Sequence, residues 1–125
     1  MKGLKTLTAV LLGTALLASA PASADAAAYQ HYVACGVSQN AKPSHSCPAG
    51  SKKGAFFKSS LEGLVYYTVC VKFPTKTKPL CAESQEAKQG VLYLNKITST
   101  IPGMHKVTWF VEGKRVGTFI FNVPR

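Results

Sequence analysis

Four cysteines in two closely spaced pairs constrain this chain more than any other feature. Cys35 precedes Cys47 and Cys70 precedes Cys81, so each pair encloses about a dozen residues. Cysteines in even number normally pair in an oxidising compartment, and four allow three connectivities. Because each pair brackets a segment rich in turn formers, we expect the disulfides Cys35–Cys47 and Cys70–Cys81. The competing interpretation is a zinc site, but zinc ligands usually come from close pairs such as C-x-x-C, which the sequence lacks.

The N-terminal segment has the layout of a secretory signal peptide. Lys2 and Lys5 precede an apolar stretch from Leu7 to Ala18, and Ala22-Ser23-Ala24 follows. The apolar stretch is shorter than the roughly 20 residues that a bilayer span needs, so we expect no transmembrane segment. We predict a signal peptide over 1–24 and one mature domain over 25–125, secreted or associated with the cell envelope.

Period-two alternation of apolar residues predicts strands through most of the mature chain. The expected strands are Leu64–Phe73, His105–Glu112 and Val116–Val123, with weaker ones at Gly90–Thr100, Ala55–Ser59 and Ala27–Ala34. Ser84–Gln89 is the only plausible helix and is long enough for one turn at most. Six or seven short strands without a long helix indicate an all-β fold, a two-sheet antiparallel β-sandwich. Trp109 shares a strand face with Val107 and Val111, so we expect it between the sheets.

The closing segment Gly103–Val123 resembles the last two strands of secreted bacterial immunoglobulin-like domains. It has a glycine before the first strand, Trp109 at the strand centre, a tight turn marked by Gly113 and a Phe-x-Phe-x-Val ending. With the signal peptide and the four cysteines, the whole chain is similar to small exported proteins of Gram-positive bacteria. This resemblance implies an immunoglobulin-like antiparallel β-sandwich of six to seven strands with two disulfides, and an extracellular location. It says nothing specific about function.

The same hairpin is similar to that of copper-binding periplasmic sandwich proteins of the CopC type. That family binds copper through an N-terminal histidine and a histidine in the turn before the last strand. Here the expected mature terminus is Asp25 and the turn is Glu112–Arg115, so both ligand positions depart from the family. The histidines that remain are His31, His45 and His105. Copper binding through them is an alternative only. We expect no metal or cofactor.

The mature chain offers little for catalysis, because few side chains in it can orient a base. Its carboxylates are Asp25, Glu62, Glu83, Glu86 and Glu112. A Ser-His-carboxylate triad needs a carboxylate that orients the imidazole, whereas Asp25 lies at the chain end and Glu83 and Glu86 lie on a polar connector. Two disulfides leave no thiol nucleophile, and no phosphate loop, HExxH or calcium loop is present. We predict that the protein is not an enzyme.

Positive charge is the feature that points to a partner. The chain has 15 Lys and Arg against 5 Asp and Glu, a formal charge of +10. Within it, basic residues gather in or beside the expected loops, at Lys52, Lys53, Lys72, Lys76, Lys78, Lys114 and Arg115. Such clusters favour a non-catalytic binding or structural module retained at the bacterial cell envelope by an anionic polymer or an extracellular protein. The competing interpretation is that lysines keep a small surface soluble.

Aromatic residues argue against nucleic acid as the partner. Most of them alternate toward the expected core, where they form no stacking platform for bases. Phe56 and Phe57 are the exception, because one of two adjacent strand residues faces away from the core unless a loop covers it.

A second class of function is inhibition of serine proteases. The segment between Cys70 and Cys81 would form a disulfide-tethered loop, with Lys76, followed by Thr77, entering a trypsin-like specificity pocket. Tethering reduces the entropy that a loop loses on binding. Lys78 is a poorer specificity residue because Pro79 follows it.

Overall fold

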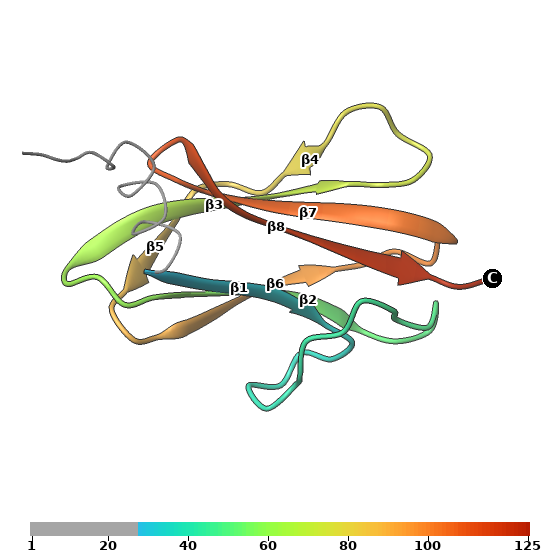
Figure 1. Ribbon diagram of the computed structural model, residues 1–125, viewed down its shortest axis with the longest axis horizontal. Helices are drawn as coiled ribbons and strands as arrows, with labels where there is room; N and C mark the ends of the chain where they lie inside the picture. The colour runs from blue at the N-terminus through green and yellow to red at the C-terminus, as the bar shows by residue number, and fades with distance from the viewer. Residues whose placement is uncertain (1–27) are drawn as a thin grey trace, which may run out of the picture.

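The computed structural model describes residues 28–125, which form two antiparallel sheets packed face to face (Figure 1). The first sheet has the order β1-β2-β6, formed by Tyr29–Ala34, Lys53–Ser59 and Leu92–Ile97. The second has the order β4-β3-β7-β8, formed by Leu80–Cys81, Leu64–Lys72, Gly103–Val111 and Lys114–Val123, and β5 (Gln85–Lys88) also pairs with β3. The predicted signal peptide lies outside the described residues. Within them, we find no helix long and apolar enough to cross a bilayer.

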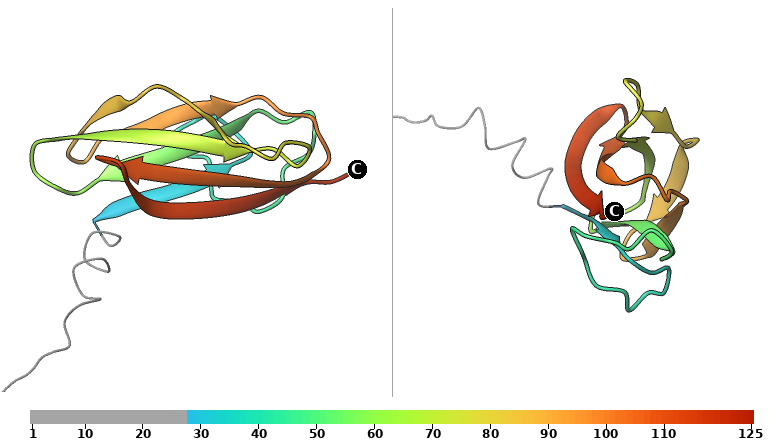
Figure 2. Two further views of the ribbon diagram at one scale, coloured as in Figure 1. Left: turned by 90° about the horizontal axis from the view of Figure 1, so that it is seen from above. Right: turned by 90° about the vertical axis from the view of Figure 1, so that its right-hand side faces the viewer.

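The strand order is that of an immunoglobulin-like sandwich. The first, second and sixth strands share one sheet, while the third, seventh and eighth share the other. Figure 2 shows the sheets facing each other across the core, with the β1–β2 loop projecting from the sandwich. The predicted fold class is therefore confirmed.

The core forms where the inward faces of β3 and β7 meet β1 and β2. Alternate residues of β7 are buried, and Trp109 at its centre has no exposed surface. In β3, Tyr67 is 1% exposed, and its ring stacks on Phe57 of β2 with centroids 4.3 Å apart. Burial raises the pKa of Tyr67 to about 12, because an ionised phenolate would be poorly solvated there. Trp109 thus lies between the sheets, as the alternation predicts.

The expectation of a helical turn at Ser84–Gln89 is wrong. Gln85–Lys88 is strand β5, antiparallel to the first half of β3. Ala87 is buried opposite Val65, while its neighbours on the strand are exposed. This segment is too short to stabilise a helix, and the free edge of β3 offers it backbone partners. Because Leu80–Cys81 pairs with β3 as well, there are eight strands instead of six or seven.

The β7–β8 hairpin has the predicted tight turn. Glu112 and Gly113 both have positive φ, 50° and 81°, as a two-residue type I′ turn requires. Glu112 is held in this conformation by Tyr66: its N–H donates to the Tyr66 carbonyl at 3.0 Å, and its carboxylate accepts from the Tyr66 N–H at 3.1 Å.

The two disulfides join the pairs expected from the sequence. Cys35–Cys47 ties the start of the long β1–β2 loop to its later part, where Cys47 is buried. Cys70–Cys81 joins β3 to β4 at directly opposed positions. Each bridge therefore fixes a connection at the same end of the sandwich.

Phe57 faces the core and Phe56 faces outward, as the alternation requires. Phe56 is nevertheless only 1% exposed. Its ring stacks on Tyr32 with centroids 5.0 Å apart, and Leu94 lies opposite it on β6. Neighbouring strands thus cover Phe56, and neither phenylalanine is available as an exposed binding residue.

We predict that Trp109→Ala lowers the free energy of unfolding by about 3 to 5 kcal/mol, because it leaves a large cavity in the closed core. Phe110→Ala on the partly exposed outer face is the matched control and should cost less. Urea denaturation measures both, and a loss below about 1 kcal/mol for Trp109→Ala would contradict its central packing role.

Candidate anion-binding end

The basic residues singled out from the sequence do not form one patch. Lys52, Lys76 and Lys78 are exposed at the end of the sandwich that holds the β1–β2, β3–β4 and β6–β7 loops and the C-terminus (Figure 1). Lys114 and Arg115 follow the β7–β8 turn at the opposite end. The length of β7, nine residues, separates the two groups by roughly 30 Å at about 3.3 Å per residue. An anion at one group therefore does not reach the other.

Charge is strongly segregated along the sandwich. The end with the three loops, which we call the basic end, comprises residues 35–53, 72–81, 95–106 and 120–125. It contains no Asp or Glu and nine cationic residues: Lys42, Lys52, Lys53, Lys72, Lys76, Lys78, Lys96, Lys106 and Arg125. From residue 54 onward, the described residues outside these ranges carry four positive and four negative side chains, which cancel. They are Lys58, Lys88, Lys114 and Arg115, and Glu62, Glu83, Glu86 and Glu112. Nearly all the net charge of the described chain thus lies at one end.

Two lysines of the basic end face each other directly. Lys72 on β3 is the register partner of Lys106 on β7, and both side chains are exposed. They border a shallow hollow of about 420 Å³ on the outer face of the sheet, together with Thr108, Phe110 and the Cys70–Cys81 bridge. Like charges directly opposite on neighbouring strands are destabilising. A bound anion would relieve this repulsion.

Lys53 differs from the expectation, because it lies inside the sandwich and not on its surface. It is the register partner of Ile97 and only 1% exposed. Its ammonium group donates to the carbonyls of Ser51 and Ala49, at 2.8 and 3.3 Å. Burial lowers the pKa of Lys53, because the charged ammonium group is desolvated there. Lys53 therefore adds positive potential from below the surface without being a contact residue.

Ser99 and His105 form a hydrogen-bonded pair beneath the β6–β7 loop. The Ser99 hydroxyl lies 2.7 Å from His105 Nε2, and His105 Nδ1 lies 3.1 Å from the Gly103 carbonyl. Because a carbonyl only accepts, Nδ1 carries the proton and Ser99 donates to Nε2. The ring is fully buried and stacks on Phe121. The Gly103 carbonyl thus occupies the position at Nδ1 that a carboxylate holds in a catalytic triad. The hydrogen bond between Ser99 and His105 fastens the β6–β7 loop to β7.

The other two histidines lie in separate environments. The His31 ring packs 5.2 Å from that of Trp109, and it is so close to Gly117 that a Cβ there would clash at 2.1 Å. His45 stacks on Phe119 and shares a 2.6 Å hydrogen bond with the Ile120 carbonyl. Across residues 28–125, no three His, Cys, Asp or Glu side chains come together as metal ligands. The geometry therefore gives the copper alternative no support.

The loop proposed for protease inhibition is exposed at the basic end. Lys76 and Thr77 lie between β3 and β4, and the Lys76 N–H donates to the Phe73 carbonyl at 3.1 Å, which forms a turn. The Cys70–Cys81 bridge joins the strands on either side of the loop. Insertion of Lys76 into a protease stays a prediction.

Sequence reasoning missed Lys42, Lys96, Lys106 and Arg125 as members of the basic end. Lys106 occupies an outward position in β7, which alternates between buried and exposed residues, a signal that is readable in the sequence. Lys96 lies on β6, where four partly buried residues precede it and no such alternation marks it. Strand pairing places Lys96 and Lys106 near the lysines of the loops. The alternation of residues along one strand does not reveal which strands pair.

Comparison with known proteins returns likenesses of structure only. No protein-family model matches the chain, and neither does any curated protein sequence. An immunoglobulin-like protein from Pseudomonas aeruginosa superposes with a TM-score of 0.48 and 17% identity, over 76% of this chain and 90% of the other. The soluble domain of PmoD from a Methylocystis species gives 0.47 and 11%, over 76% and 90%. At these scores the likenesses carry no functional argument, and the strand order itself establishes the fold.

A β-glucosidase from Listeria innocua also contains a similar part. It superposes with a TM-score of 0.47 and 12% identity, over 78% of this chain but only 16% of the glucosidase. The likeness is thus confined to a small part of that enzyme, and its activity does not transfer.

We predict that the protein is less stable in acid, because burial lowers the pKa of both His31 and His105 below their ordinary value of 6.5. The folded chain then binds protons less readily than the unfolded chain. The free energy of unfolding should be highest above pH 6.5 and fall as the pH drops below it. Urea midpoints at several pH values measure this.

The double variant His31→Gln, His105→Gln provides the control, and the single variants replace it if the double variant does not fold. The urea midpoint of the variant should depend less on pH than that of the parent protein between about pH 8 and pH 5, an interval that brackets the ordinary histidine pKa. A parent protein that is equally or more stable at the acid end would refute the expectation.

Proposed function

We propose that the chain is a secreted, non-catalytic binding module that holds an anionic partner at the cell envelope through its basic end. The observation that carries this proposal is the segregation of charged side chains: nine cationic residues and no Asp or Glu at one end, against a balanced remainder of the described chain. Lysines that served solubility alone would have no reason to gather away from every carboxylate. Solubility is normally served by charges of both signs mixed over the surface.

The opposed pair Lys72 and Lys106 supports the same proposal. These lysines repel each other in the free protein, and a phosphate or carboxylate group between them would lie close to both ammonium groups. Lys76 and Lys78 extend the positive surface along the neighbouring loop. Repeated anionic groups along a polymer would therefore make several contacts at once. Each exposed contact is weak, and together they give appreciable but salt-sensitive binding.

The proposal is tested with two variants of equal net charge. One replaces Lys72, Lys76, Lys78 and Lys106 with Gln at the basic end; the other replaces Lys58, Lys88, Lys114 and Arg115 with Gln at the opposite end. Four exposed contacts at about 0.5 kcal/mol each predict that the first variant loses roughly 30-fold in affinity. The second should lose little. Long-chain polyphosphate and isolated Gram-positive cell walls are the probes, measured by calorimetry and by sedimentation.

Salt provides the second arm of this test. The Debye length falls from about 30 Å at 0.01 M to about 3 Å at 1 M, so raising the salt should release the parent protein from both probes. Equal losses in the two variants would mean that only net charge matters. Retention at the highest salt would also contradict the proposal, because electrostatic attraction would then not be the source of binding.

A further inference from the structure

Strand β6 leaves one edge of its sheet unpaired. It is last in the order β1-β2-β6, and no described strand lies on its outer side. In constant-type immunoglobulin domains a further strand continues the corresponding sheet. Here the segment before β6 supplies β5, which pairs with β3 in the opposite sheet instead. Half of the backbone N–H and C=O groups of β6 therefore face away from β2, as at any sheet edge.

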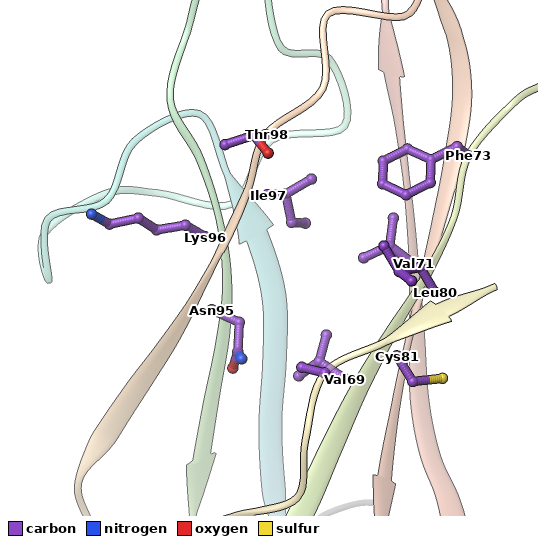
Figure 3. A pocket seen from close by; sticks show the side chains of 10 residues that line it. Val69, Val71, Phe73, Leu80, Cys81, Asn95, Lys96, Ile97 and Thr98 are labelled. Carbon is purple, nitrogen blue, oxygen red and sulfur yellow. The ribbon is translucent and has the colours of Figure 1, made fainter.

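Beside this edge, the space between the sheets is open. A hollow of about 330 Å³ lies between β6 and the strands β3 and β4 (Figure 3). In Figure 3, Ile97 points across the hollow toward Val71 and Lys96 points away from it. Leu80 on the far wall is 69% exposed. The opposite side of the sandwich is closed, because His31 of β1 packs directly on Gly117 of β8. The β6 side is thus where apolar side chains can enter.

A second hollow, of about 430 Å³, continues along the same segment as far as Thr100. Its other wall comes from the β1–β2 loop and the start of β2. The two hollows share Lys96, Ile97 and Thr98, which form the strip between them. Lys52, Lys53 and Lys96 line the second hollow, and no carboxylate lines either one. An occupant of this edge therefore meets apolar side chains on one wall and positive charge on the other.

We propose that the β6 edge binds an extended acidic segment of a partner polypeptide by strand addition. This rests on the proposed function and names its partner class. Successive side chains of an added strand point to opposite faces, so apolar residues would enter the hollow beside Val71 while acidic residues approach Lys96 and Lys52. A polypeptide fits better than a polyphosphate, because only a polypeptide offers backbone donors and acceptors to the β6 edge. A second copy of this chain is disfavoured, since two basic ends would repel.

The probe is an acetylated and amidated heptapeptide of alternating Glu and Val, titrated into isotopically labelled protein and followed by NMR. We expect amides of Leu92–Ile97 to shift and to exchange more slowly with solvent. In the control peptide, alternate backbone nitrogens are methylated. This peptide keeps the side chains but loses the backbone N–H groups that would donate to β6. It should bind about tenfold more weakly, the equivalent of one net hydrogen bond. A Lys-Val peptide should not bind.

Leu80→Asn places a polar, uncharged side chain in the apolar hollow at a highly exposed position, so the fold and the charge of the basic end should both be retained. It should weaken binding of the Glu-Val peptide while leaving polyphosphate binding intact. The control is Leu64→Asn, 48% exposed at the other end, which should change neither. Equal binding of the methylated peptide, or protection located on β4 or β8, would overturn strand addition. Polyphosphate binding without peptide binding overturns this inference alone, and loss of both overturns the proposed function as well.

Discussion

The packing of Trp109 between the two sheets is the interaction on which the rest of the structure depends. Its strand, β7, lies between β3 and β8, so the inward face of this one strand aligns both neighbours over the opposite sheet. That alignment brings β8 against β1, where the His31 ring fits only because position 117 is glycine. Closure on this side leaves the β6 side as the open one. The β1–β2, β3–β4 and β6–β7 loops share one end because β1, β3 and β6 all run toward it (Figure 1).

Two of the four described carboxylates outside the basic end have structural contacts, both of them with Tyr66. Glu112 accepts a hydrogen bond from the Tyr66 backbone, and Glu86 accepts one from the Tyr66 hydroxyl at 3.2 Å. This bond and the charge of Glu86 raise the pKa of Tyr66, since both favour the neutral phenol. At the basic end Lys53 has only carbonyl partners, and Lys72 faces another lysine. Compensating negative charge must therefore come from solvent ions or from a partner.

Much of the fold follows from alternation in the sequence, and the parts that do not have a common cause. The strands around Tyr67, Trp109 and Phe121 are predicted because their inward faces are continuous and apolar. β4 and β5 are too short to carry such a pattern and exist because the edge of β3 offers them partners. The burial of Lys53 could have been predicted from alternation, since Lys53 shares its strand face with Ala55 and Phe57. It was missed because Lys52 and Lys53 are adjacent and look like a pair of surface lysines. The opposition of Lys72 and Lys106 depends on register, which a single sequence does not contain.

We propose that one end of this sandwich, and not the net charge of the whole chain, attracts anions. NMR titration of the labelled protein with polyphosphate at low salt tests it most directly, because each backbone amide reports its own location. We expect shifts confined to residues 35–53, 72–81, 95–106 and 120–125, with those of Lys72 and Lys106 among the largest. Shifts of equal size around Lys88, Lys114 and Arg115, or none at the basic end, would contradict it.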